Sequence, residues 1–260
     1  MDQHELDIAR SLEADPALLP FLPFILQDLD ELGGFTHCLL SLIRSALLGR
    51  TASVLDLGCG KGVAACELAK EFGWSVTGVD LFEPFLSNAR QRAKRMKVDH
   101  LCHFECADAR TFLKQTEPVD VIVMFSVDRF FGTIRDTIGE VRKALKPGGI
   151  LAIEEMYLAP GVTEPVKVYS ECMDKDTTLR ELAAHGDHIV NAIEYEPAEV
   201  AKWNKWALER IAERSHELLK DHPELQAALS LYNDTQREAC DVLNNKIIIG
   251  LYLLKRSDGE

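Results

Sequence analysis

From Ser53 onward, short apolar segments alternate with segments of helical periodicity. The apolar segments are expected strands: SVLDL (53–57), SVTGVD (75–80), LCHFECA (101–107), VDVIVMF (119–125) and ILAIEEMYL (150–158). The expected helices between them lie at about 62–72, 84–97, 109–115 and 133–145. Strands that alternate with helices of about 10 to 15 residues form parallel βαβ units with right-handed crossovers. The sequence therefore predicts an α/β fold with a doubly wound, mostly parallel sheet, in which ligands bind at the carboxyl ends of the strands.

Helical patterns flank this alternation on both sides. About fifty residues of helical character precede the first strand, in the segments 4–14, 19–32 and 36–48. The fifth strand is followed by a short helix, a strand, two long helical stretches and a final strand, at about 177–185, 188–196, 197–220, 223–243 and 246–256. We therefore expect an N-terminal helical extension over 1–50 and one seven-stranded domain over 51–260, with a helical insertion at about 197–243 before the last strand.

Composition narrows the class of protein. With 42 acidic and 29 basic residues, the chain has a formal charge of −13, which repels a phosphate backbone and argues against nucleic acid as a partner. The first residues, MDQHELDIARS, do not resemble a signal peptide, and no apolar run approaches the roughly 20 residues that span a bilayer. The seven cysteines, an odd number, are typical of reduced thiols. We expect a cytoplasmic protein with no membrane partner.

The densest group of potential metal ligands is DHLCHFEC, with His100, Cys102, His103 and Cys106. These residues alternate as in a strand whose apolar face carries Cys102, Phe104 and Cys106. A zinc finger needs a second ligand pair at loop spacing, and none follows. A second group, HGDH at 185–188, contains a glycine that is typical of a helix end and a turn. We therefore expect no metal site.

Three glycines, Gly58, Gly60 and Gly62, follow the first expected strand where the chain turns into a helix. Residues without a Cβ let backbone amides approach a ligand closely at a helix N-terminus. A phosphate-binding P-loop is excluded, because it requires G-x-x-x-x-G-K-[ST] and Lys61 is followed by glycine. The dinucleotide fingerprint G-x-G-x-x-G/A fits poorly, because GCGKGV ends in valine.

Asp80 closes the second expected strand, twenty positions after Gly60. A carboxylate at this place can accept hydrogen bonds from both hydroxyls of a ribose, whichever nucleoside carries it. Glycines after strands also serve as turn residues, and an aspartate after a strand often caps a helix. Each residue alone is compatible with such a structural role, but together they indicate a nucleoside site.

Taken in order, five elements resemble the class I S-adenosylmethionine-dependent methyltransferases over residues 53–157, with looser agreement through the final strand. They are VLDLGCGKG, VTGVD, ADAR after the third strand, VDVIVMF, and LKPGG before the fifth. The resemblance implies a Rossmann-like fold, S-adenosylmethionine as cofactor and S-adenosylhomocysteine as product.

The resemblance also implies which residues bind the cofactor. The methionine portion is expected on Asp56, Gly58, Cys59, Gly60 and Gly62. The ribose hydroxyls are expected on Asp80, and the adenine ring on Leu81, Asp108 and Ala109. Phe125 is expected beside the methionine or sulfonium portion. We expect Cys59 to contribute its backbone and not its thiol, and Lys61 to face solvent.

Methyl transfer is an in-line displacement that requires an aligned nucleophile and the exclusion of water. A general base is needed only if the nucleophile arrives protonated, and the candidates near the ends of the fourth and fifth strands are Asp128, Glu154, Glu155 and Tyr157. Only one of the two glutamates can face the pocket if the strand continues through both. Asp128 has a structural alternative as a helix cap or a partner of Arg129. No catalytic residue is assigned.

The expected acceptor is a small molecule. The NPPY-type tetrapeptide, which is linked to methylation of planar amino groups in nucleic acids or glutamine, is replaced by MFSVDRFF after the fourth strand. A noncatalytic cofactor-binding or scaffold protein of the same fold is the alternative, because a fold does not prove turnover. A nicotinamide-dependent dehydrogenase is a more distant one.

The insertion at about 197–243 has two interpretations. Trp203 and Trp206 belong to apolar spacings that predict packing on the sheet domain or on a partner subunit, so a homodimer is compatible with the sequence. The functional interpretation is a lid over the substrate pocket, with the first fifty residues as the opposite wall.

Overall fold

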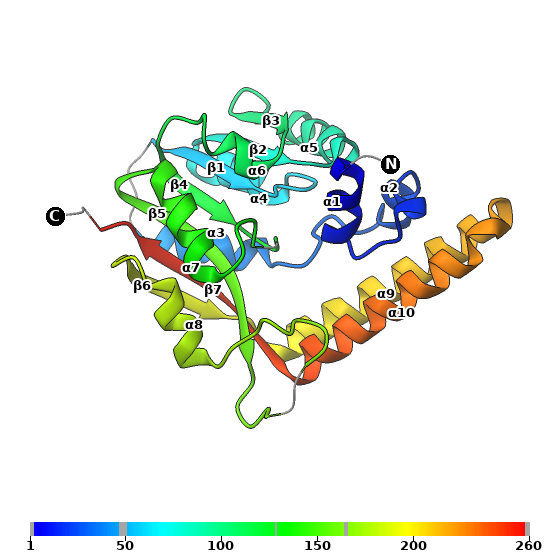
Figure 1. The fold of residues 1–260 in the computed structure, drawn as a ribbon. Coiled ribbons are helices and arrows are strands. Elements are labelled where there is room, and N and C mark those ends of the chain that lie inside the picture. Colours follow the sequence, from blue (N-terminus) through cyan, green and yellow to red (C-terminus); the bar gives the residue numbers. More distant parts are fainter. Residues whose placement is uncertain (1–2, 47–50, 128, 164–165, 258–260) are drawn as a thin grey trace. The chain divides into compact units, whose positions relative to one another are not determined.

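The computed structural model describes residues 3–46, 51–127, 129–163 and 166–257 (Figure 1). The chain divides into two compact units. A helical unit comprises Met1–Asp30, Leu158–Cys172 and Tyr195–Ile248, and an α/β unit comprises Glu31–Tyr157, Met173–Glu194 and Ile249–Glu260.

The sheet has seven strands in the order β3-β2-β1-β4-β5-β7-β6. Their bounds are β1 Ser53–Leu57, β2 Ser75–Asp80, β3 Cys102–Cys106, β4 Val119–Met124, β5 Leu145–Leu158, β6 His188–Glu194 and β7 Ile247–Lys255. The pairs among β1 to β5 are parallel, and β6 pairs with β7 in antiparallel orientation. The predicted doubly wound, mostly parallel sheet is confirmed.

The helices of the α/β unit are α3 Thr36–Ser45, α4 Val63–Phe72, α5 Glu83–Met96, α6 Ala109–Phe112, α7 Ile134–Val141 with the 3-10 turn Arg142–Ala144, and α8 Lys175–Leu182. Alternate strand residues such as Leu55, Leu57 and Ile122 are buried against α7. Because strand side chains alternate between faces, Asp56 lies on the opposite face. Helix α4 packs against β2, β3 and α5.

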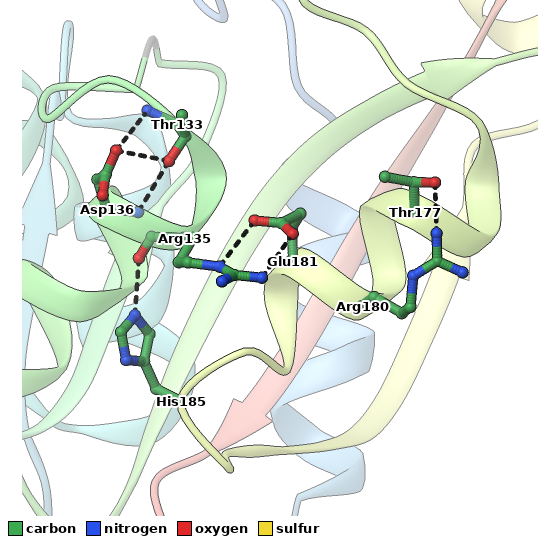
Figure 2. Close-up of polar contacts among 7 residues, drawn as sticks. All are labelled: Thr133, Arg135, Asp136, Thr177, Arg180, Glu181 and His185. Carbon is green, nitrogen blue, oxygen red and sulfur yellow. Dashed lines mark hydrogen bonds and ion pairs between the residues drawn. The ribbon is translucent and has the colours of Figure 1, made fainter.

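Polar contacts fix α7 against α8 (Figure 2). Thr133 and Asp136 form a capping box at the start of α7, so the first backbone donors of this helix are satisfied. Arg135 forms an ion pair with Glu181 of α8 at 2.8 Å. His185 Nε2 donates to the Arg135 carbonyl oxygen at 2.9 Å, which ties the turn after α8 to α7.

The fifth strand begins at Leu145, five residues earlier than predicted. Val119 pairs with Leu145 and Val121 with Ile150, so the intervening residues KPGG form a bulge within the strand. Pro147 lacks a backbone donor, and a bulge accommodates such a residue without loss of a ladder hydrogen bond. The predicted helix at 133–145 is correspondingly shorter.

The helical unit contains α1 Gln3–Ser11, the 3-10 turn Pro16–Leu18, α2 Leu22–Ile25, α9 Pro197–Asp221, the 3-10 turn Pro223–Leu225 and α10 Gln226–Asn245. Helices α9 and α10 lie side by side as a hairpin (Figure 1). The predicted helical segment at 19–32 contains only the four residues of α2, because Pro20 and Pro23 provide no backbone N–H. Among the described residues, no helix has the length and apolar character needed to cross a bilayer.

Trp206 of α9 is 40% exposed, so it does not lie in the core of this chain, and its packing on a partner subunit stays a prediction. The buried stripe of α9 instead consists of Val200, Asn204, Ala207, Ile211, Ser215 and Leu218. Its polar members are hydrogen-bonded to α10, Asn204 to Asn244 at 2.7 Å and Ser215 to Asn233 at 3.0 Å. The buried face of α9 therefore consists of smaller side chains, some of them polar. A search for apolar residues at helical spacing does not detect such a face.

Candidate functional site

The glycine loop connects β1 to α4 with three left-handed residues. Gly58, Gly60 and Gly62 have φ values of 72°, 50° and 70°. At Gly62 a Cβ would also stand 2.6 Å from the Ala89 Cβ, so this position requires glycine for both conformation and space. At Gly60 a Cβ would meet no atom closer than the Leu32 Cδ1 at 3.9 Å. The backbone at Gly60 can therefore be approached by a ligand.

Asp80 connects the glycine loop to the end of β2. Its Oδ2 accepts a hydrogen bond from the Gly60 N–H at 2.8 Å, and its Oδ1 accepts one from the Phe82 N–H at 2.9 Å. Burial raises the pKa of the Asp80 carboxyl, although hydrogen bonds from the backbone of Phe82, Gly60 and Leu81 oppose the rise. Each oxygen keeps a second lone pair for a further donor, such as a ribose hydroxyl.

Asp56 lies in β1 beneath the glycine loop and is 1% exposed. Its Oδ2 is buried and has no hydrogen-bond partner in the structure. Burial, and to a smaller extent the charge of Asp80, raise the pKa of Asp56 from 3.8 to about 7, although a backbone hydrogen bond from Ala65 opposes the rise. An unsatisfied buried carboxylate oxygen costs free energy, and a cationic or hydrogen-donating ligand would remove that cost.

The side chains of the loop itself are buried. Burial raises the pKa of the Cys59 thiol well above its usual value, and the charges of Asp56 and Asp80 add to the shift, so the thiol is not a nucleophile. Lys61 is 6% exposed and its Nζ lies 5.5 Å from the centre of the Phe85 ring. The expectation that Lys61 faces solvent is wrong, because an aromatic face accommodates the ammonium group inside.

The residues expected around adenine lie at the ends of β2 and β3. Leu81 is half-buried and Ala109 is buried at the start of α6. The Asp108 carboxylate accepts from the Arg110 N–H at 2.7 Å as the cap of α6, and it also binds the Arg110 guanidinium. Hydrogen bonds from Arg110 lower the pKa of Asp108. Asp108 therefore has the capping role that its position after a strand also indicated.

A segment preceding α3 covers the carboxyl ends of β4 and β5. A methyl group on Gly34 would overlap the Phe125 ring and stand 2.8 Å from the Glu154 Oε2. The Ser126 Oγ donates to the Leu32 carbonyl oxygen at 3.3 Å, and Ser126 has a φ of 55°. The segment at 32–34 thus belongs to the site, although its two glycines lie between the expected helical segments 19–32 and 36–48. Their small size was the available signal.

Replacing Gly34 by alanine is expected to destabilise the fold by about 1 to 2 kcal/mol, because the methyl group displaces the Phe125 ring. Thermal unfolding should show a decrease in Tm of roughly 3 to 6 °C. The double variant Gly34→Ala/Phe125→Leu replaces the aromatic ring by a smaller side chain. It should recover part of the stability that Gly34→Ala loses. An unchanged Tm in Gly34→Ala would mean that the segment does not pack on Phe125.

The two glutamates of β5 differ in environment. Glu155 is 5% exposed and forms a bidentate ion pair with Arg129, at 2.7 Å for the closest pair of atoms. Glu154 points to the other face of the strand, where its carboxylate lies next to Gly34. Glu155 is held by Arg129, whereas the Glu154 carboxylate, like the Phe125 ring, lies next to Gly34. The other candidate base, Asp128, lies outside the described residues.

Tyr157 is buried, and its hydroxyl donates to the Glu194 carboxylate. Lys175 Nζ donates to the same carboxylate at 2.6 Å. Burial and the neighbouring Glu194 raise the pKa of Tyr157. A phenol whose proton is held in this way is a poor general base, and its hydroxyl instead links β5 to the end of β6.

Helices on both faces of the sheet and a glycine loop at the carboxyl end of β1 define a Rossmann-like α/β protein. A family model described as a methyltransferase domain matches residues 48–220. The chain belongs to this methyltransferase domain family, and the resemblance inferred from the sequence is confirmed.

Individual relatives match a smaller part of the chain. YjhP of Escherichia coli, an uncharacterized protein, is 33% identical over 104 residues, 40% of this chain and 42% of YjhP. The 27-O-demethylrifamycin SV methyltransferase of Amycolatopsis mediterranei is 31% identical over 107 residues, 41% of this chain and 39% of that enzyme. The matches therefore span about two fifths of the length of these curated relatives.

Solved structures resemble nearly the whole chain. A methyltransferase from Geobacter sulfurreducens, crystallised with S-adenosylhomocysteine, has a TM-score of 0.77 at 20% identity, covering 90% of this chain and 96% of that one. The X-ray structure of YjhP has a TM-score of 0.75 at 19% identity, covering 89% and 98%. At these identities the likeness shows a shared fold.

Proposed function

We propose that the protein transfers a methyl group from S-adenosylmethionine to a small-molecule acceptor. The observation that carries the proposal is the Asp80 carboxylate, held 2.8 Å from the Gly60 N–H at the carboxyl end of β2, beside a loop whose backbone is open at Gly60. Ligands of open α/β sheets bind at this edge, and an acidic residue there suits ribose hydroxyls. Membership of the methyltransferase domain family supports the same reaction.

The residues present fit this cofactor. The unpartnered Asp56 Oδ2 offers an acceptor and, when ionised, a negative charge near the methionine portion. Asp80 binds the ribose hydroxyls, and the glycine loop contributes backbone groups at Gly58, Gly60 and Gly62. Leu81, Asp108 and Ala109 are proposed to contact adenine, with Phe125 beside the sulfonium.

The cofactor supplies a methyl group bonded to a positively charged sulfur. The chain's own contribution is position and exclusion of water, because alignment of two reactants alone lowers the barrier substantially. The Phe125 ring and the Gly34 segment provide an apolar wall at the ends of β4 and β5. If the acceptor arrives protonated, Glu154 is the proposed base, since Glu155 is neutralised by Arg129.

A small-molecule acceptor is supported by the name of the Amycolatopsis relative and by the absence of an NPPY-type segment after β4. The charge of −13 disfavours nucleic acid. We further propose a cytoplasmic location, which the seven free thiols support. We also propose that the chain divides into an N-terminal extension over 1–50 and a methyltransferase domain over 51–260. A homodimer is a further proposal.

S-adenosylhomocysteine is expected to bind the purified protein and to raise its Tm. A ligand at ten times its Kd stabilises the folded state by about 1.4 kcal/mol, which corresponds to roughly 3 to 5 °C for a chain of this size. Calorimetry and thermal unfolding measure both effects, with NADH as the control ligand. Binding of NADH without binding of S-adenosylhomocysteine would refute the proposal.

Turnover is tested separately. The protein is incubated with S-adenosylmethionine and a panel of small acceptors, and the formation of S-adenosylhomocysteine is measured together with a mass increase of one methyl group on an acceptor. Binding without turnover on any acceptor would favour the noncatalytic alternative.

A further inference from the structure

Two thiols on neighbouring elements form a pair behind the glycine loop. Cys66 lies in α4 and is fully buried, whereas Cys102 is the first residue of β3 and is half-buried. Their side chains are hydrogen-bonded to each other. The Cys102 Sγ also lies 3.9 Å from the Ala65 carbonyl oxygen, which places it against the first turn of α4.

This first turn is directly connected to the glycine loop. The Cys66 N–H donates to the Gly62 carbonyl oxygen at 3.0 Å. Gly62 has no space on its other side, because a Cβ there would stand 2.6 Å from the Ala89 Cβ and 3.1 Å from the Phe104 ring. If Cys66 moves, Gly62 therefore moves with it, because the packing around Gly62 leaves no cavity in which the shift could end.

The two sulfurs differ in reactivity. The hydrogen bond from Cys66 lowers the pKa of Cys102, although burial and the charges of Asp56 and Asp99 oppose this. The same hydrogen bond and burial raise the pKa of Cys66. Because Cys102 is half-buried and Cys66 is fully buried, Cys102 is the sulfur that a hydroperoxide reaches, and Cys66 is the sulfur that resolves the product.

We propose that Cys66 and Cys102 are a dithiol site that a hydroperoxide oxidises to a disulfide, and that this bond weakens cofactor binding at the glycine loop. The Cys102 thiolate attacks the peroxide, the O–O bond breaks, and the alcohol or water leaves, giving a sulfenic acid. The Cys66 sulfur then attacks the Cys102 sulfur and water leaves. In total, two thiols and one hydroperoxide give one disulfide, one alcohol or water, and one water.

The bond changes the geometry of the loop. A disulfide joins its sulfurs at about 2.05 Å, which is closer than two hydrogen-bonded thiols approach, so its formation draws the first turn of α4 toward β3. Gly62 and the loop before it move with that turn. The effect on affinity rests on the proposed function, whereas the formation of the cross-link does not.

The test uses the reduced full-length protein, treated with hydrogen peroxide and digested with trypsin without reduction. The expected product joins peptide 62–70 to peptide 98–110 with the loss of two hydrogens. We expect the Kd of the peroxide-treated protein for S-adenosylhomocysteine, measured by calorimetry, to be about five-fold or more above that of the reduced protein. Treatment with a phosphine reductant should bring the Kd back to the value of the reduced protein.

Cys106, exposed on the same strand, provides the matched control. Cys106→Ser should keep the cross-link and the peroxide sensitivity, whereas Cys66→Ser and Cys102→Ser should lose both. Absence of the linked peptide in the natural chain, or an unchanged Kd in the linked protein, would overturn the inference. A reduced protein that does not bind S-adenosylhomocysteine refutes the proposed function instead, and the linked peptide alone then decides whether the dithiol site exists.

Discussion

Replacing Asp80 by alanine is expected to weaken S-adenosylhomocysteine binding by about 2 to 3 kcal/mol, or roughly 30- to 150-fold in Kd. The carboxylate is a shared acceptor for two ribose hydroxyls, and it also accepts hydrogen bonds from Gly60 and Phe82. Its removal costs ligand contacts and releases the glycine loop from β2. Calorimetric titration of the purified variant measures the change.

Two further variants separate these contributions. Asp80→Asn keeps one oxygen acceptor and should lose less affinity than alanine. Asp99→Ala removes an exposed carboxylate from the turn before β3 and should leave the Kd unchanged. An unchanged Kd in Asp80→Ala would remove this residue from the site, provided that circular dichroism shows the fold to be intact.

The central strands β1, β4 and β5 were predictable because they are largely buried and their sequences are short, mostly apolar runs. β1 and β2 have the bounds expected from SVLDL and SVTGVD. The edge strand β3 was less regular. Cys106, expected on an apolar face, is exposed because it ends the outermost strand, where no further element covers it. Trp206 shows the corresponding limit for helices, because apolar spacing does not reveal which face a partner helix covers.

Each predicted part of the site lies on a short segment at the end of a strand. The glycine loop carries its own signature, and the contact of Asp80 with Gly60 follows from the parallel pairing of β1 with β2. Residues brought together from distant segments had no such signal. The packing of Gly34 on Phe125 joins residues about ninety positions apart, and the Arg129–Glu155 pair depends on how the chain leaves β4. Such contacts are set by tertiary packing.

Asp56 should make the free energy of unfolding depend on pH in an unusual direction. Its folded-state pKa of about 7 is above the ordinary value of 3.8, so the folded protein favours the protonated carboxyl. This contribution to stability is complete below pH 4 and is lost as pH rises through 7. The total cost of ionising the buried group is about 4 kcal/mol, of which about 2 to 3 kcal/mol falls between pH 5 and 8.

Asp56→Asn cannot ionise, so the free energy of unfolding of this variant, minus that of the natural chain, should increase by about 2 to 3 kcal/mol from pH 5 to pH 8. Urea unfolding at several pH values measures it. Asp120→Asn is the matched control. Although burial raises the pKa of Asp120, hydrogen bonds from Lys146 and Ser53 lower it to about 2. The free energy of unfolding of Asp120→Asn, minus that of the natural chain, should therefore stay constant between pH 5 and 8. A constant difference for Asp56→Asn as well would show that Asp56 has an ordinary pKa.

The same titration with saturating S-adenosylhomocysteine connects this buried group to the site. The ammonium group of the ligand's methionine portion favours the ionised form of a neighbouring carboxylate and so lowers its pKa. If that portion binds beside the unpartnered Asp56 Oδ2, the difference between Asp56→Asn and the natural chain should lose most of its dependence on pH. A dependence that persists unchanged would place the ammonium group elsewhere. Asp56 therefore reports on cofactor binding through the stability of the fold, independently of any turnover.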